Sequence, residues 1–147
     1  MKVCLTWDYE LYFGERTGTA DSCMIRPTER LLSLAKDAQA SMTFFVDASY
    51  LLRLSELRET DPTLQKDYEA ISDQLQRMVM DGHEIGLHLH PHWIDCTWQN
   101  GAWKMEVTRY KWSDITAGER ERHFQDAFGL LKDLTGTTIT SYRAGGW

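Results

Sequence analysis

The chain has 147 residues, which is enough for one domain with a sizeable buried core. Its 42% hydrophobic and 26% charged content is typical of a globular protein, and no apolar run approaches the roughly 20 residues of a membrane span. The formal net charge of −6 argues against nucleic acid as the main partner, because phosphate binding requires a basic face. The residues that follow Met1 do not read as a signal peptide, so we expect a cytoplasmic protein unless the sequence was cut from a longer one.

Apolar runs alternate with segments of helical periodicity along the chain. Pro27 and the pair Asp61-Pro62 suit the starts of helices, whereas Gly82 and Gly136 suit their ends. In chain order we expect a strand at 3–7, a helix from residue 27, a strand at 42–46, a helix at 48–59, a long helix at 62–81, a strand at 84–89, a hairpin turn at 100–101, a helix at 116–134 and a strand at 138–142.

Strands that alternate with helices predict an α/β fold with parallel strand pairing. No internal repeat or linker interrupts the sequence, so residues 1–147 are expected to form a single domain. Polar residues follow three of the expected strands: Asp8 and Glu10 the first, His88 to His92 the third, and Arg143 the fourth. Because parallel α/β folds place their sites at the carboxyl ends of the strands, we expect these residues to meet.

Four of the five histidines fall within residues 83–92. Aliphatic residues at 85, 87 and 89 alternate with the residues between them, which is the period of a strand, and His88, His90 and His92 would then share one face. Pro91 is expected to end regular pairing just beyond His90. Histidine is the commonest metal ligand, so this segment predicts a buried strand that carries a metal site.

Two histidines and one carboxylate form a common ligand set for Zn²⁺ and other divalent ions. Asp8 and Glu10 can supply the carboxylate ligand and a general base, and Arg143 could keep that base ionised. We prefer His88 and His92 as the metal pair. For His90 a ligand role ranks below a supporting role or a substrate contact.

The remaining histidines and the tryptophans carry weaker signals. His83 begins like an HExxH zinc motif, but the position of the second histidine is occupied by Leu87. His123 lies in the helix expected at 116–134, where we expect it on the surface. Several tryptophans follow the histidine strand; core packing is their usual role, but a polar loop beside a site also suits stacking on sugar rings. The candidate substrate contacts are therefore His90, Trp93, Trp98 and Trp103.

Three segments together resemble a known family. Residues 6–10, Thr-Trp-Asp-Tyr-Glu, are similar to a TFDDG or TxDxE motif, and residues 82–92, Gly-His-Glu-Ile-Gly-Leu-His-Leu-His-Pro-His, are similar to GHEIGxH followed four residues later by a histidine. Residues 142–147, Tyr-Arg-Ala-Gly-Gly-Trp, resemble an RxPxG-type motif. In this order they resemble the polysaccharide deacetylases of the NodB-homology class, carbohydrate esterase family 4.

The resemblance implies a distorted, incomplete (β/α) barrel, similar to a TIM barrel, that hydrolyses acetyl groups on a sugar polymer with a divalent metal. It implies Asp8 as the general base, His88 and His92 as metal ligands, and Arg143 as the residue that holds Asp8. The family's usual third ligand position is Tyr9 here, so we assign that role to Glu10, with Asp8 as the competing ligand. Zinc is the metal we favour, with Co, Ni, Fe or Mn as alternatives.

The family continues past its third motif to further strands, which carry an aspartate that braces the arginine and a histidine that acts as general acid. The sequence therefore resembles the amino-terminal part of such a domain, and the isolated chain is expected to be inactive unless His90 replaces that acid. A barrel without its last strands has an exposed sheet edge, which predicts self-association. Two alternatives remain: an allantoinase-like C–N hydrolase of the same superfamily, and a catalytically degenerate carbohydrate-binding domain.

Overall fold

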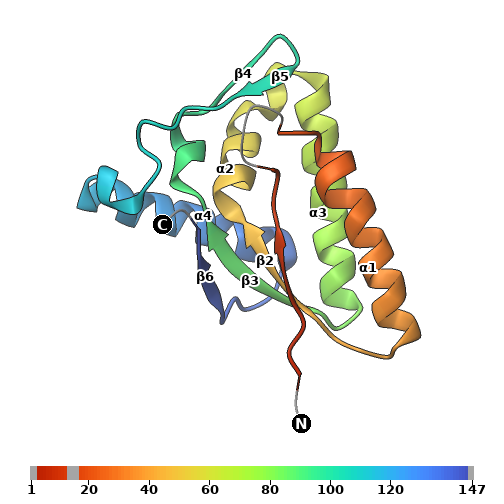
Figure 1. Ribbon diagram of the computed structural model, residues 1–147. Coiled ribbons are helices and arrows are strands. Elements are labelled where there is room, and N and C mark those ends of the chain that lie inside the picture. The colour runs from red at the N-terminus through yellow and green to blue at the C-terminus, as the bar shows by residue number, and fades with distance from the viewer. Residues whose placement is uncertain (1–2, 13–16, 146–147) are drawn as a thin grey trace.

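The computed structural model describes residues 3–12 and 17–145 (Figure 1). Its strands and helices run in the order β1 (Thr6–Tyr9), α1 (Arg26–Asp37), β2 (Thr43–Asp47), α2 (Ala48–Leu57), α3 (Pro62–Met80), β3 (Glu84–Leu89), β4 (Thr97–Gln99), β5 (Ala102–Lys104), α4 (Ala117–Thr135) and β6 (Tyr142–Ala144). Four short helical turns join them: η1 (Asp21–Ile25), η2 (Arg58–Thr60), η3 (Pro91–Asp95) and η4 (Trp112–Asp114).

The main sheet has the strand order β1-β2-β3-β6, and all three neighbouring pairs are parallel. The sheet curls into a half-barrel with helices packed against it (Figure 1). This architecture confirms the expected parallel α/β fold and is consistent with an incomplete NodB-type barrel. No helix among the described residues is both long and apolar enough to cross a lipid bilayer.

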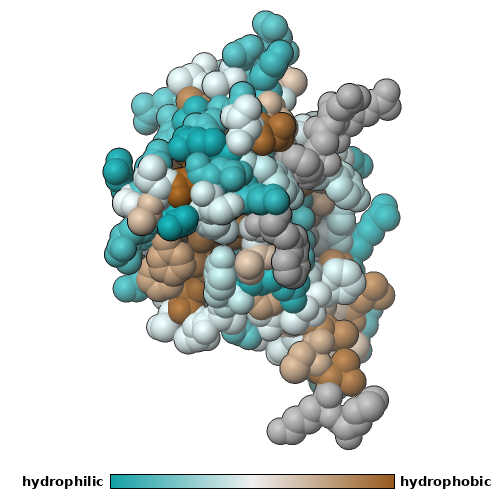
Figure 2. All heavy atoms as spheres, turned by 60° about the vertical axis from the view of Figure 1, so that its left-hand side comes forward, coloured by the Kyte–Doolittle hydropathy of each residue, from teal (hydrophilic) through white to brown (hydrophobic). Residues whose placement is uncertain are grey.

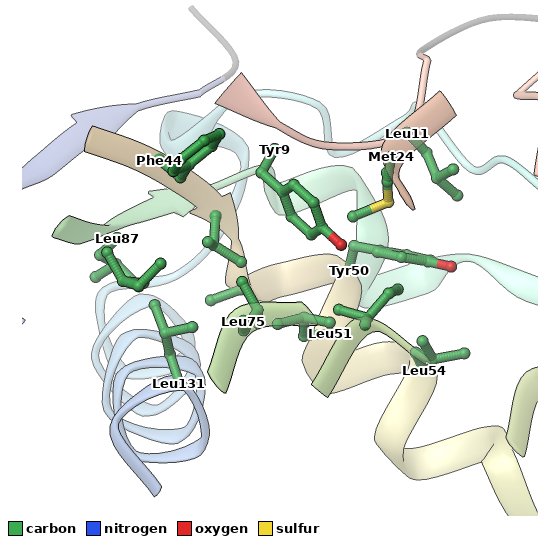
Figure 3. Packing of buried hydrophobic residues seen from close by; sticks show 14 of the residues in the cluster. Tyr9, Leu11, Met24, Phe44, Tyr50, Leu51, Leu54, Leu75, Leu87 and Leu131 are labelled. Carbon is green, nitrogen blue, oxygen red and sulfur yellow. The ribbon is translucent and has the colours of Figure 1, made fainter. Parts of the chain in front are cut away.

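Alternation along the strands gives the sheet two different faces. One face packs Tyr9, Phe44, Val46 and Leu87 against helix residues in the main hydrophobic core (Figure 3). Tyr9 is 2% exposed and its hydroxyl donates a 2.7 Å hydrogen bond to Oε1 of Gln74 on α3. The Tyr9 side chain therefore lies in the core, and the side chain of Asp8, which precedes it in β1, faces the opposite side of the sheet.

The observed boundaries follow the predicted capping residues closely. The Asp61 carboxylate caps α3 through the N–H of Thr63, Pro62 starts that helix, and Gly136 ends α4 in the left-handed conformation at φ 63°. The β4–β5 hairpin turns at Asn100 and Gly101, both with positive φ. These elements were predictable because one or two local residues specify each of them.

Strands β1 and β6 begin later than predicted. β1 spans 6–9 rather than 3–7, since Val3 and Leu5 remain 67% and 45% exposed while Tyr9 enters the core. β6 spans 142–144 rather than 138–142, because its ladder with β3 starts where Tyr142 lies opposite Leu87. Apolar content alone did not reveal which residues pair.

Candidate metal centre

Polar residues from three of the four parallel strands, β1, β3 and β6, converge at the carboxyl edge of the sheet. They surround a hollow of about 460 Å³. Its lining consists of Asp8, Glu10, His88, His90, Tyr110, Arg143, Ala144 and Gly145. The hollow lies on the face of the sheet opposite the hydrophobic core, which leaves its residues available for chemistry.

Glu10, His88 and His90 form a compact cluster. Oε2 of Glu10 lies 2.7 Å from Nε2 of His90 and 3.1 Å from Nε2 of His88, and the two Nε2 atoms are 3.0 Å apart. Within residues 3–12 and 17–145 this is the one group of three such side chains whose ligand atoms are close enough to share a metal ion. The cluster joins His88 in β3 and His90 just after it to a carboxylate just after β1.

The cluster has the composition and shape that a divalent ion requires. With metal–ligand distances of about 2.0–2.1 Å, neighbouring ligand atoms of a tetrahedral site lie about 3.3 Å apart, slightly farther than here. Nδ1 of His88 lies 2.8 Å from the carbonyl oxygen of Arg143, to which it can donate. That bond orients the ring and leaves Nε2 as the nitrogen directed at the cluster. These residues therefore fit a bound metal ion.

Burial and mutual hydrogen bonding oppose each other in setting the charges of the cluster. Burial would raise the pKa of Glu10, but hydrogen bonds with His88 and His90 outweigh it and lower that pKa to about 2. Burial would lower the pKa of His88 and of His90, but their contacts with Glu10 outweigh it and raise both. The carboxylate is thus firmly ionised, and the two imidazoles hold protons more tightly than in solution.

Asp8 and Arg143 form an ion pair at the edge of the same hollow. Nη1 of Arg143 donates to Oδ1 of Asp8, and Nη2 donates a 2.7 Å hydrogen bond to Oγ1 of Thr6. The guanidinium also lies 4.1 Å from the centroid of the Phe45 ring, which supports it from below. The sequence placed Phe45 in a strand without a role at the site, and its position in β2 lies opposite Asp8 in the strand register.

His92 does not join the cluster. β3 ends at Leu89, and the helical turn η3 that begins at Pro91 removes His92 from the strand alternation. The His92 ring is 3% exposed and stacks on Tyr110 at a centroid distance of 5.9 Å. Burial first, and the nearby charge of His90 second, lower the pKa of His92 to about 4. The structure therefore brings His90, rather than His92, to Glu10 and His88.

The three tryptophans named as substrate contacts belong to an aromatic cluster around Tyr50. Trp93 is 1% exposed and donates a 2.7 Å hydrogen bond from Nε1 to Oδ2 of Asp47. Trp103 packs edge-on against Trp93 at 5.2 Å, and Trp98 against Trp103 at 5.3 Å. None of the three lines the hollow; a buried ring such as Trp93 offers no face to a sugar. The aromatic residue in the lining is Tyr110, which no sequence signal distinguished.

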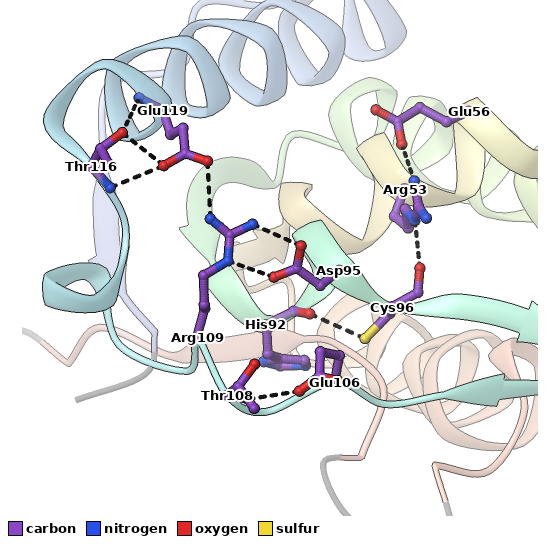
Figure 4. A network of polar contacts seen from close by, with 10 residues as sticks. All are labelled: Arg53, Glu56, His92, Asp95, Cys96, Glu106, Thr108, Arg109, Thr116 and Glu119. Carbon is purple, nitrogen blue, oxygen red and sulfur yellow. Dashed lines mark hydrogen bonds and ion pairs between the residues drawn. The ribbon is translucent and has the colours of Figure 1, made fainter.

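A guanidinium holds the loop of Tyr110 in place (Figure 4). Arg109 donates two hydrogen bonds of 2.8 and 2.7 Å to the carboxylate of Asp95 in η3 and one of 2.9 Å to Glu119 in α4. Glu119 in turn completes a capping box with Thr116. The loop that closes one side of the hollow is thus tied to two helical segments.

One of three comparisons with known proteins identifies a family. Searches of curated proteins and of solved structures found no match. Residues 146 and 147, at the end of the third motif, lie outside the described residues. The family model for polysaccharide deacetylase matches residues 3–146, essentially the whole chain. The chain therefore belongs to the polysaccharide deacetylase family.

Proposed function

We propose that this chain is a metal-binding hydrolase that removes acetyl groups from a carbohydrate. The observation that carries the proposal is the cluster of Glu10, His88 and His90, whose ligand atoms lie 2.7–3.1 Å apart beside the Asp8–Arg143 ion pair. Family membership supports the reaction class, an acetyl transfer to water.

In this proposal the metal ligands are Glu10, His88 and His90, and His90 takes the role that the sequence assigned to His92. Zinc is the favoured ion, since two imidazoles and a carboxylate match its preferences. A bound divalent ion would polarise the acetyl carbonyl and lower the pKa of water toward roughly 7.

The residues beside the cluster supply the proton chemistry. Asp8 acts as the general base that takes a proton from the attacking water. Arg143 binds Oδ1 of Asp8, so Oδ2 is the oxygen that receives the proton. Thr6 and the Phe45 ring hold the guanidinium in position. Tyr110, which lines the hollow, takes over from the three tryptophans outside it as the aromatic substrate contact.

The test is titration of the metal-free chain with zinc by calorimetry, together with acetate release from an N-acetylated and an O-acetylated oligosaccharide. We expect one ion per chain, with affinity reduced at least about 100-fold by His88→Ala and by His90→Ala. His92→Ala is the matched control, and it should retain affinity within a few-fold. Asp8→Asn should retain zinc but lose about 10²–10⁴-fold in rate.

Each outcome distinguishes a different error. Loss of zinc in His92→Ala with retention in His90→Ala would restore the ligand pair assigned from the sequence. A wild-type chain that binds no divalent ion contradicts metal dependence. Zinc and oligosaccharide binding without acetate release from either substrate would favour a catalytically degenerate binding domain.

A further inference from the structure

The fifth histidine of the chain, His123, is linked to the candidate metal centre through Ser49. His123 on α4 is half-buried, which corrects the expectation that it lies on the surface. Its Nε2 lies 2.8 Å from Oγ of Ser49, at the start of α2. Ser49 is 0% exposed, and its Oγ also accepts a 3.1 Å hydrogen bond from the backbone N–H of His90. Three elements, α4, α2 and the end of β3, thus meet at one hydroxyl.

The His88 ring is oriented by a hydrogen bond at Nδ1, and among the described residues the His90 ring has no equivalent bond. Nδ1 of His88 is paired with a backbone carbonyl, whereas Nδ1 of His90 is buried with no hydrogen-bond partner among the described residues. His90 also lies one residue beyond the end of β3, where the strand ladder no longer holds the backbone. The hydrogen bond to Ser49 holds the backbone N–H of His90, and the His90 carbonyl accepts a 3.2 Å hydrogen bond from the Trp93 N–H in the turn that follows. Of these two backbone contacts, the one to Ser49 ties the start of the His90 side chain to another element.

We propose that Ser49 and His123 are positioning residues that hold His90 at the metal centre. The inference rests on the proposed function for its metal, but the hydrogen bonds that carry it are independent of any ion. Ser49 accepts from the His90 N–H, and in the tautomer with Nε2 of His123 unprotonated it donates its own proton to that nitrogen. Burial lowers the pKa of His123, which favours the neutral imidazole that can accept this proton.

The same pair does not fit a nucleophile and its base. The Ser49 hydroxyl is fully buried, and the cavity beside it measures about 60 Å³, against about 460 Å³ for the hollow at the metal centre. A sugar residue has no access to Oγ of Ser49, and the hydroxyl already has a donor and an acceptor. The geometry suits support of His90 and not a second reaction centre.

Zinc affinity of the full chain tests the proposal. Ser49→Ala and His123→Leu should each weaken zinc binding about 10–100-fold, the usual effect of removing a group that orients a metal ligand. His123→Gln should restore affinity to within a few-fold, because its amide oxygen can accept the Ser49 proton. Ser55→Ala is the matched control on α2, since that hydroxyl bonds only to the carbonyl of Leu52 in its own helix.

A double-mutant cycle separates positioning from general destabilisation. In a His90→Ala background, Ser49→Ala and His123→Leu should change zinc affinity less than about twofold, because the group they position is gone. An equal loss in both backgrounds overturns the proposal. If Ser49→Ala fails to fold, the His123→Leu and His123→Gln pair decides alone.

Amide hydrogen exchange provides a readout without metal. In the metal-free chain, Ser49→Ala should speed exchange of the His90 amide at least about 10-fold relative to the Leu87 amide, which bonds to the carbonyl of Ser141. Ser55→Ala should leave both amides unchanged. Unchanged exchange at His90 in Ser49→Ala overturns this inference even if zinc binds, whereas faster exchange without zinc binding would contradict only the proposed function.

Discussion

Asp47 and Asp61 make the same contacts in different surroundings. Each caps a helix by accepting from a backbone N–H, and each accepts a tryptophan indole N–H, from Trp93 at 2.7 Å and from Trp98 at 2.9 Å. Asp47 is 1% exposed, and burial raises its pKa to about 6. Asp61 is more exposed, and its hydrogen bonds with Trp98 and Thr63 lower its pKa. The same set of hydrogen bonds thus accompanies a raised pKa at the buried Asp47 and a lowered pKa at the more exposed Asp61.

This difference predicts opposite pH dependences for two matched variants. Because the folded pKa of Asp47 is raised, its protonated form stabilises the fold at low pH, and that contribution is lost as pH rises through about 6. As pH rises from 4 to 7, the free energy of unfolding of Asp47→Asn should therefore increase relative to that of wild type, by up to about 3 kcal/mol. Urea unfolding at a series of pH values measures the difference.

Asp61→Asn is the control with the opposite sign. Since the folded pKa of Asp61 is lowered, its contribution is present above about pH 4 and lost below it. The stability deficit of Asp61→Asn should shrink as pH falls below 4 and stay constant from pH 5 to pH 7. A flat difference between Asp47→Asn and wild type over pH 4–7 would contradict the buried-carboxyl account.

Gly86 provides the space for the ring under Arg143. A Cβ at this position would lie 2.7 Å from Cδ1 of Phe45 and 2.7 Å from Oγ of Ser141. Gly86→Ala should therefore displace Phe45 and destabilise the chain by about 1–3 kcal/mol. Gly129→Ala, inside α4 with no atom within 4 Å of its Cβ, should instead stabilise it by about 0.5–1 kcal/mol. Chemical denaturation checks both, and equal stability of Gly86→Ala and wild type would show that Phe45 moves without cost.

Among the elements, the loop that carries Tyr110 depends on a single guanidinium. Arg109 joins η3 and α4 through Asp95 and Glu119, and a planar fork is required to bind Asp95 with two donors (Figure 4). Arg109→Lys keeps the charge but loses the fork, so amide exchange across residues 105–111 should accelerate several-fold. The exposed Arg122→Lys on α4 is the control and should leave that loop unchanged. Equal exchange in both variants would assign the loop's order to its aromatic contacts.

At the scale of the whole molecule, the described sheet has two outer strands, β1 and β6. Exposed apolar side chains accompany both, with Leu5 and Trp7 at 45% and 40% and Tyr142 at 51%. Figure 2 shows hydrophobic side chains gathered near the N-terminal end of the chain, beside the start of β1. Unpaired strand edges of this kind favour pairing with a second copy.

We therefore expect the isolated chain to self-associate as its concentration rises. Sedimentation velocity over a wide concentration range should show a growing dimer or larger species, which Tyr142→Lys or Leu5→Lys reduces. Met80→Lys is the control: Met80 is 76% exposed at the end of α3 and belongs to neither outer strand. A strict monomer at every concentration would contradict this expectation.

Local sequence signals predicted the elements and the edge of the sheet that carries the site. Asp61-Pro62 and Gly136 marked helix ends because a cap needs one side chain or one permitted backbone conformation. Parallel pairing then brought Asp8, His88 and Arg143 to one edge, since each lies next to the last residue of a strand of one sheet. The choice between His90 and His92 was not predictable, because it depends on where β3 ends and the turn at Pro91 begins.

The amino-acid sequence by itself determined the α/β class, the three motifs and the residue types of the centre, because these follow from periodicity, capping and ligand chemistry. Tertiary structure alone decided that Trp93 is buried, that Tyr110 lines the hollow and that Ser49 links His123 to the backbone of His90. Ser49 and His123 lie 74 positions apart in the chain and meet only when α2 and α4 pack together. Contacts of that kind depend on the packing of whole helices, which no local pattern encodes.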